Sequence, residues 1–179
     1  RLVAHGDGAG ELIERAEAIA QEYVGDFIYG RGDDRLEEVM VRELTKRGLT
    51  LAVAESCTGG FLAHRITNVS GASAVFLAGH CTYSNEAKQS TLGVKPETLA
   101  GHGAVSEAVA SSMAQGVRAT AGTDLGLAIT GIAGPSGGSP GKPVGTVHFA
   151  LASDQGLAHL HRWYPYADRA RNRRISTWE

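Results

Sequence analysis

Charge excess and long apolar segments are both missing from this chain of 179 residues. The formal net charge is −2, so we expect no general electrostatic attraction to nucleic acid or to a membrane surface. No apolar run approaches the roughly 20 residues that a membrane-spanning helix needs. Residues 1–10 are polar and glycine-rich, which is unlike a signal peptide. The sequence therefore predicts neither a nucleic-acid partner nor a membrane protein.

Cysteine is also scarce. Cys57 and Cys81 are too few for the disulfide framework of a small secreted domain, so we expect a cytoplasmic protein. Glycine, by contrast, is abundant at 24 residues, and it clusters in turns without forming a repeat. Together with 42% hydrophobic residues, this composition is typical of an α/β protein with a buried core and ligand-binding loops.

Apolar periodicity predicts strands that alternate with helices. Strands are expected at 49–54, 73–83, 125–130, 145–153 and 157–164. Helices are expected at 11–23, 35–48, 61–66, 85–90 and 106–121, with a basic helix from Asp168 onward and a turn opened by Pro96. This alternation predicts an α/β fold, namely a three-layer α/β/α sandwich with a mixed, largely parallel sheet. The last two strands are expected to form an antiparallel hairpin.

The chain is expected to divide near residue 32. Before that point, the first predicted helix is followed by a short strand candidate at 27–29, which makes a short α+β segment. We interpret residues 1–32 as the tail of a preceding small linker domain and residues 33–179 as the main α/β domain. Asp33 or Asp34 is expected to cap the first helix of the main domain.

The junction after the strand at 49–54 carries the most suggestive side chains. The apolar run stops at the polar segment 55–60, and a helix opens at Phe61. Backbone N–H groups at a helix N-terminus are unpaired, so Ser56 is well placed to attack a carbonyl while such groups hold the oxyanion. Cys57 competes as the nucleophile, although a buried packing role is the alternative. Ser56 could also be only a helix cap.

A second polar segment offers a base. Residues 83–88 follow another predicted strand, and Lys88 lies about one turn into the next helix. A lysine that is desolvated in a crevice loses proton affinity and can act as a general base, and serine–lysine pairs are a variant of the serine–histidine arrangement. Tyr83 could relay a proton or fix the lysine. The alternatives are a solvated Lys88 and a Tyr83 that only packs.

A glycine-rich loop at 131–141 follows the predicted strand at 125–130. In open α/β sheets, ligands bind beyond the carboxyl ends of the parallel strands. This loop and the segment 55–60 both start at such ends, so we expect them to line one crevice. The alternative for the loop is a flexible turn without a ligand.

Three other features allow two interpretations each. Glu55 could orient Lys88 or bind substrate, or it could be a structural carboxylate that accepts backbone N–H bonds. His159 and His161 share one strand face at a spacing compatible with a metal, but no third ligand is evident, so we favour a solvated face. The arginines at 169–174 suggest nucleic acid, but a solvated helix end with one substrate arginine fits the acidic balance of the chain better.

Three motifs together resemble the CinA C-terminal domain family, whose members are nicotinamide-nucleotide amidases, also called nicotinamide mononucleotide deamidases. They are Ala-Glu-Ser-Cys-Thr-Gly-Gly at 54–60, Tyr-Ser-Asn-Glu-Ala-Lys at 83–88, and Thr-Gly-Ile-Ala-Gly-Pro-Ser-Gly-Gly with Lys-Pro-Val-Gly-Thr at 130–146. The resemblance covers about residues 34–174. Residues 1–32 resemble the segment that precedes this domain in full-length CinA proteins.

The resemblance implies a reaction in pyridine-nucleotide salvage, in which nicotinamide mononucleotide and water give nicotinate mononucleotide and ammonia. It implies Ser56 as the nucleophile, Lys88 as the base and Tyr83 as an assisting hydroxyl, without a metal or other cofactor. The phosphate is expected to meet backbone N–H groups that follow Thr130, or an arginine. The expected substrate-binding residues are Glu55, Cys57, Thr58, Gly59, Gly60, Asn85, Thr130, Gly131, Gly134, Arg169 and Arg173.

Two further readings of the function remain open from the sequence. One is a nucleotide-binding or protein-interaction module that has kept the fold without turnover, and the other is a serine hydrolase for another amide. The resemblance also implies a homodimer or a larger homo-oligomer, and the exposed apolar residues expected in the N-terminal segment agree with this.

Overall fold

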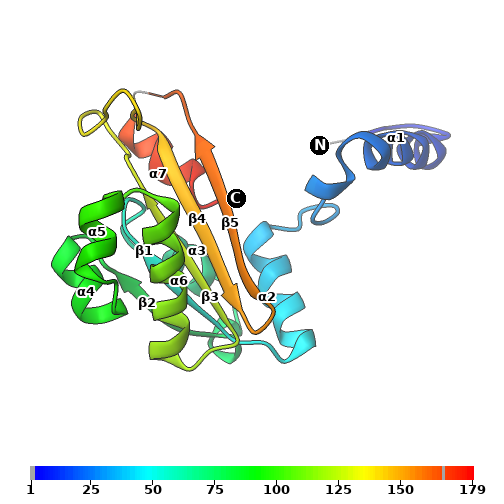
Figure 1. Ribbon diagram of the computed structural model, residues 1–179. Helices are drawn as coiled ribbons and strands as arrows, with labels where there is room; N and C mark the ends of the chain where they lie inside the picture. The colour runs from blue at the N-terminus through cyan, green and yellow to red at the C-terminus, as the bar shows by residue number, and fades with distance from the viewer. Residues whose placement is uncertain (1–2, 167) are drawn as a thin grey trace.

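A computed structural model describes residues 3–166 and 168–179 of the chain. At its centre is a five-stranded sheet in the order β2-β1-β3-β4-β5 (Figure 1). β1 runs parallel to β2 and β3, whereas β4 is antiparallel to β3 and β5. The predicted mixed sheet with a closing hairpin is therefore confirmed. The strands are β1 (Leu51–Glu55), β2 (Phe76–Cys81), β3 (Leu125–Gly131), β4 (Thr146–Ser153) and β5 (Gly156–Trp163).

Helices cover both faces of this sheet, so the three-layer α/β/α architecture is also confirmed (Figure 1). One face is covered by α4 (Asn85–Leu92), α5 (Pro96–His102) and α6 (Glu107–Ala121). The other face is covered by α2 (Leu36–Arg47), α3 (Phe61–Thr67) and α7 (Arg169–Ile175).

The alternation of side chains along β1 explains the two layers of the core. Leu51 and Val53 point into the cluster under α2 and α3, whereas Ala52 and Ala54 point towards α6. All four side chains are buried, as expected for a strand in the middle of a parallel array. The alanines leave room for a helix to pack close to the sheet.

Glycine makes the approach of α6 closer still. At Gly126 of β3, a Cβ atom would lie 2.2 Å from the Ala114 carbonyl oxygen of α6. At Gly116 of α6, a Cβ atom would lie 2.0 Å from the carbonyl oxygen of Leu92. Any side chain at either position would push α6 away from the sheet or from α4. The position of α4 bears on the expected site because this helix carries Lys88.

The N-terminal arm differs from the rest of the chain. It consists of α1 (Ala9–Val24) and a 3₁₀ turn, η1 (Gly25–Phe27), and α1 projects away from the sheet with no buried residue (Figure 1). The strand expected at 27–29 is wrong, because Ile28 and Tyr29 follow η1 in an extended stretch with no strand partner among the described residues. A strand needs a neighbouring strand for its backbone hydrogen bonds.

Three boundaries also differ from expectation. Arg35 occupies the N-cap of α2, not Asp33 or Asp34; the Asp34 carboxylate instead accepts bonds from the Arg31 N–H and the Arg42 guanidinium. The strand expected at 73–83 is shorter, because the 3₁₀ turn η2 (Ala72–Ala74) precedes β2. Pro96 opens the seven-residue helix α5 instead of a simple turn, since proline is favoured in the first helical turn.

Candidate active site

The predicted nucleophile turn forms directly after β1. The Ser56 N–H donates to the Ile129 carbonyl of β3 (2.9 Å), and the Gly59 N–H donates back to the Ser56 carbonyl (3.1 Å). Gly59 and Gly60 have positive φ angles of 63° and 87°, which glycine adopts without the strain of a side chain. The turn therefore closes within four residues, and α3 begins at Phe61 as the sequence predicted.

Lys88 meets Ser56 in this structure. The Lys88 Nζ lies 3.0 Å from Ser56 Oγ and 2.8 Å from the Thr82 carbonyl oxygen, with the Tyr83 carbonyl oxygen at 3.4 Å. The Lys88 side chain is only 1% exposed, which is rare for lysine. Burial lowers the pKa of Lys88, although the nearby Cys57 and Cys81 thiols oppose this shift. The alternative of a solvated Lys88 is therefore wrong.

The environment of Cys57 disfavours the reactive thiolate form that a cysteine nucleophile needs. Its side chain is buried under the turn, and burial raises the pKa of the thiol to about 12. The thiolate is the reactive form of cysteine, so the thiol stays protonated and inert near neutral pH. The packing interpretation holds for this residue, and the structure gives Cys57 no exposed surface of note for a substrate contact.

Glu55 holds the helix rather than the lysine. Its two carboxylate oxygens accept bonds from the Leu62 N–H (3.0 Å) and the Ala63 N–H (2.8 Å) of α3. The side chain is 1% exposed, so its assignment to the substrate-binding set is corrected. Glu55 is the structural carboxylate that the sequence offered as the alternative. It accepts hydrogen bonds from N–H groups that the first turn of a helix leaves unpaired.

Tyr83 and Asn85 lie at the end of the neighbouring strand β2. The Tyr83 ring is exposed, and its hydroxyl accepts a hydrogen bond from the Arg169 guanidinium of α7. Asn85 is the first residue of α4 and is exposed. Ser84 caps that helix by accepting the Ala87 N–H (3.1 Å). Tyr83 therefore links the end of β2 to α7 through its hydroxyl, while its backbone carbonyl helps to hold Lys88.

The glycine-rich loop after β3 borders the same end of the sheet. The buried Thr130 hydroxyl donates to the Ala104 carbonyl (2.8 Å), which ties β3 to the segment before α6. At Gly131, a Cβ atom would lie 2.8 Å from the Thr146 carbonyl oxygen and 3.1 Å from Cys57 Sγ. The close approach of β3 to the nucleophile turn therefore requires glycine at this position.

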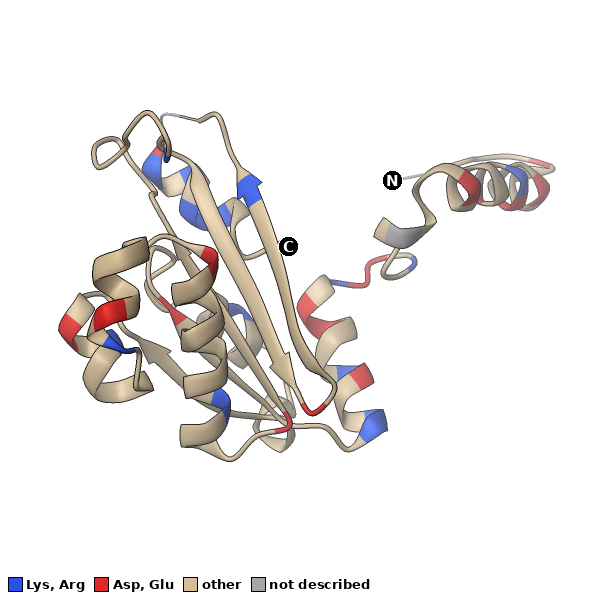
Figure 2. Cartoon of the chain, in the orientation of Figure 1, with Lys and Arg blue, Asp and Glu red and all other residues tan. Residues whose placement is uncertain are grey.

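The helix α7 bridges these loops and carries four arginines (Figure 2). Arg169 donates to the Gly134 carbonyl (2.9 Å) as well as to the Tyr83 hydroxyl. Arg173 donates to the Thr58 carbonyl (2.9 Å). Arg173 also lines a cavity of about 610 Å³, whereas Arg169 is not among its lining residues. The cavity is lined by Phe61, Asp168, Ala170, Arg171, Arg173 and Arg174.

Sequence reasoning missed two contributors to this site. Thr82 supplies the carbonyl closest to Lys88 Nζ. Asn172, buried in α7, donates to the Ala133 carbonyl (3.0 Å) and the Tyr166 carbonyl (2.8 Å). A backbone carbonyl leaves no signal in the residue type. An asparagine within a predicted basic helix reads as solvated, so only the tertiary structure identifies these roles.

The two histidines of β5 form a cluster with a third from β4. His148 Nδ1 lies 3.0 Å from His159 Nε2, and the His161 ring stacks on the His148 ring at 4.7 Å between centroids. Burial and the two neighbouring imidazoles lower the pKa of His148 to about 4. Within residues 3–166 and 168–179, no group of three or more histidine, cysteine or acidic side chains is arranged to hold a metal ion.

The comparisons with known proteins agree with this architecture. The model of the CinA C-terminal domain matches residues 33–178. This chain belongs to that family. A competence-damage inducible protein from Caldanaerobacter subterraneus subsp. tengcongensis is 55% identical over 145 residues, which are 81% of this chain and 35% of that protein. A CinA-like protein from Syntrophotalea carbinolica is 49% identical over 176 residues, 98% of this chain and 42% of its own length.

Solved structures of CinA relatives have the same fold. A competence/damage inducible protein from Agrobacterium tumefaciens has a TM-score of 0.78 at 41% identity, covering 80% of this chain and 87% of its own. A CinA superfamily protein from Escherichia coli has a TM-score of 0.78 at 31% identity, covering 84% and 90%. The CinA-family chain thus spans less than half the length of the curated relatives above. None of its described helices is long and apolar enough to cross a membrane.

Proposed function

We propose that this CinA-family domain is a serine amidohydrolase that converts nicotinamide mononucleotide to nicotinate mononucleotide and ammonia. The contact that carries the proposal is the 3.0 Å separation between Ser56 Oγ and the buried Lys88 Nζ. A serine becomes nucleophilic when a base within hydrogen-bond reach takes its proton. A buried lysine with a lowered pKa can be that base, since its neutral form is more accessible than in water.

The acceptors around Lys88 favour the geometry that a base needs. A neutral amine has two N–H bonds and one lone pair. The Thr82 and Tyr83 carbonyl oxygens can accept the two N–H bonds, which leaves the lone pair for the Ser56 hydroxyl proton. Because carbonyl oxygens only accept hydrogen bonds, they orient the amine without supplying a competing proton.

The reaction then proceeds in two halves. Ser56 Oγ attacks the carboxamide carbon as its proton moves to Lys88 Nζ, and the Cys57 and Thr58 N–H groups are candidate donors to the oxyanion. The Lys88 ammonium returns a proton to the departing nitrogen, so ammonia leaves and an ester on Ser56 remains. Water, deprotonated by Lys88, then attacks the ester carbon, and nicotinate mononucleotide departs as Ser56 regains its proton.

The remaining side chains are assigned to substrate. Tyr83 would assist the proton transfers from the crevice side, where Arg169 holds its hydroxyl. Arg169 and Arg173 each have N–H donors beyond those that contact the protein, and guanidinium groups bind phosphate well. Backbone N–H groups after Thr130, in the stretch with Gly131 and Gly134, are the other candidate phosphate donors.

The assembly of the protein is also a proposal. Residues 1–32 would be the tail of a small linker domain in a longer, cytoplasmic CinA-type protein, and the chain would form a homodimer or larger homo-oligomer. The support is the arm itself: Leu12, Ile19 and Tyr23 are each more than half exposed along one stripe of α1. Light scattering on the purified chain would give the oligomeric state, and a monomer would overturn that part.

The activity is tested by ammonia release from nicotinamide mononucleotide without added metal. The wild-type chain should release ammonia, and Ser56→Ala should lower the rate about a thousandfold or more. Ser90→Ala, at an exposed position on α4, is the matched control and should retain the wild-type rate. Nicotinamide alone should be a poor substrate, because it lacks the ribose and phosphate.

Two results would contradict the proposal. Turnover that survives in Ser56→Ala would exclude the serine mechanism. A wild-type chain that is stabilised against heating by nicotinamide mononucleotide, yet releases no ammonia, would instead indicate a binding module without turnover.

A further inference from the structure

Side chains on one face of α7 form hydrogen bonds with the loops of the candidate site. Its arginine and asparagine side chains donate to the nucleophile turn, to Tyr83 and to the loop after β3. The acceptors are the Thr58 carbonyl for Arg173, the Tyr83 hydroxyl and Gly134 carbonyl for Arg169, and the Ala133 carbonyl for Asn172. A helix that joins three separate loops can fix their relative positions.

The Arg173 contact is the one that reaches the nucleophile turn. Arg173 Nη2 donates to the Thr58 carbonyl at 2.9 Å. The guanidinium also lies against Gly59, where a Cβ atom would come within 3.1 Å of the same nitrogen. The arginine thus covers the Thr58–Gly59 peptide, whose N–H closes the turn onto the Ser56 carbonyl.

We propose that Arg173 is a positioning residue that clasps the Ser56–Gly59 turn from α7 and holds it in the conformation needed for catalysis. This inference rests on the proposed function, because it assigns Arg173 a task in the Ser56 reaction. Rotation of the Thr58–Gly59 peptide would break both the Arg173 bond and the Gly59–Ser56 bond. It would also turn the neighbouring N–H groups, the candidate oxyanion donors, away from the reacting carbon.

The clasp is distinct from phosphate binding by the same side chain. A guanidinium carries five N–H donors, so one bond to Thr58 leaves others for an anion. A phosphate ligand acts on substrate binding, and its loss raises KM. A clasp acts on the geometry of the turn, and its loss lowers kcat even when substrate is saturating. The two roles therefore separate in the kinetic constants.

The first test measures the amide hydrogen exchange of the Ser56–Gly59 turn in the absence of substrate. Amide hydrogen exchange is compared among the wild-type chain, Arg173→Met and Arg47→Met, since Arg47 is an exposed arginine of α2 that pairs only with Glu43 among the described ion pairs. The clasp predicts at least about tenfold faster exchange of the Gly59 N–H in Arg173→Met, and no change in Arg47→Met. Unchanged exchange in Arg173→Met would overturn the proposal, whether or not the chain turns over nicotinamide mononucleotide.

The second test uses kinetics with nicotinamide mononucleotide. Because a misplacement of about 1 Å can cost on the order of a hundredfold in rate, Arg173→Met should lower kcat by about ten- to a hundredfold. Arg173→Lys, which keeps a donor for the Thr58 carbonyl, should recover part of the loss, and Arg47→Met should lose none. A raised KM with unchanged kcat would overturn the clasp in favour of a phosphate ligand. A wild-type chain that is inactive would count against the proposed function, while the exchange test would still decide the clasp.

Discussion

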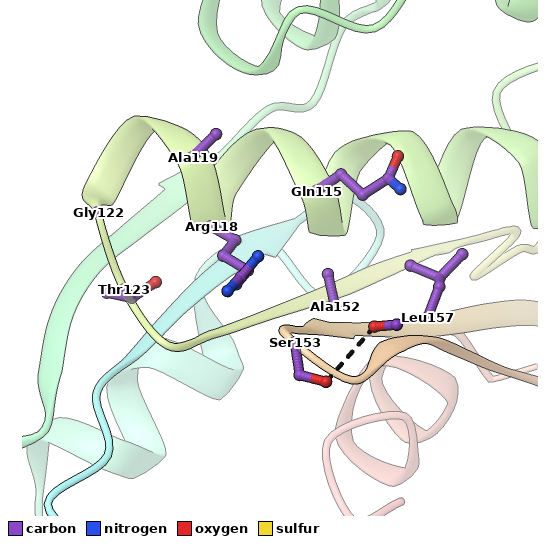
Figure 3. A pocket seen from close by; sticks show the side chains of 9 residues that line it. Gln115, Arg118, Ala119, Gly122, Thr123, Ala152, Ser153 and Leu157 are labelled. Atoms are coloured by element: carbon purple, nitrogen blue, oxygen red, sulfur yellow. Dashed lines mark hydrogen bonds between the residues drawn. The ribbon is translucent and has the colours of Figure 1, made fainter.

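The two ends of the sheet each have a hollow, but they differ in what lies beside it. At the carboxyl end of β1, the cavity of about 610 Å³ is lined by Phe61 and by α7, whose Arg173 also contacts the Thr58 carbonyl. At the opposite end, a cavity of about 450 Å³ lies between the end of α6 and the β4–β5 turn (Figure 3). The hollows alone do not distinguish a site from a surface groove.

Buried polar groups make the distinction. At the carboxyl end, Glu55 and Lys88 are each 1% exposed. Glu55 accepts N–H bonds from α3, and Lys88 donates to the Thr82 and Tyr83 carbonyls and lies 3.0 Å from Ser56 Oγ. At the opposite end, Ser153 donates to the Gly156 carbonyl (Figure 3). Arg118 donates to the Asp124 carbonyl, and both are exposed bonds that hold turns. Burial of a charge is costly, so the carboxyl end carries the larger desolvation cost of the two, as expected for the proposed site.

Removal of the Lys88 amine should have the largest effect on activity of all the changes considered for the two ends of the sheet. Lys88→Met keeps the length and apolar stem of the side chain but removes the base, so the rate of ammonia release should fall by about a hundred- to ten-thousandfold. The free energy of unfolding should rise at the same time, because a buried charge is replaced by an apolar group. Enzyme assays and chemical denaturation check the two effects, and a variant that is both active and less stable would contradict this account.

The pH dependence of the reaction should follow the same amine. The base must be neutral, and burial places its pKa below the ordinary lysine value of 10.5. The value of kcat/KM should therefore rise with pH and level off before pH 10.5 is reached. A pH–rate profile measures this directly. A midpoint at or above the ordinary lysine value would show that Lys88 is not the desolvated base.

Replacement of the buried thiol should have a much smaller effect on activity. Cys57→Ala should keep kcat within a few-fold of wild type, because the protonated thiol takes no part in the reaction. It should cost about 1 kcal/mol of stability through the lost sulfur contacts. Steady-state kinetics and thermal unfolding measure both quantities, and abolished turnover in a folded variant would return Cys57 to consideration as the nucleophile.

The hollow at the opposite end should give the smallest effect. Arg118→Met removes the exposed bond to the Asp124 carbonyl, so stability should change by about 1 kcal/mol or less. The rate of ammonia release should stay within about twofold of wild type, because the side chain is remote from the nucleophile turn. A drop in rate beyond tenfold would show that the two ends of the sheet are coupled.

The sequence predicted the sheet because buried apolar runs are local patterns. It also placed Ser56 and Lys88 in polar segments at strand ends, while the resemblance to the CinA C-terminal domain family implied their pairing. It failed for features that depend on contacts between distant segments. The strand at 27–29 has the right composition but lacks a partner strand. The Glu55 carboxylate is satisfied by α3, and the partners of Arg169, Asn172 and Arg173 are fixed only when α7 packs against the loops.

The identity of the covalent intermediate tests the central claim most directly. Nicotinamide mononucleotide is mixed with the wild-type chain, the reaction is quenched in acid within the first turnover, and the modified residue is located by fragmentation mass spectrometry. The expected product is an ester on Ser56 whose added mass equals the substrate less ammonia, and no such ester should form in Ser56→Ala. An adduct on Cys57, or steady turnover with no adduct at any time, would contradict the serine mechanism.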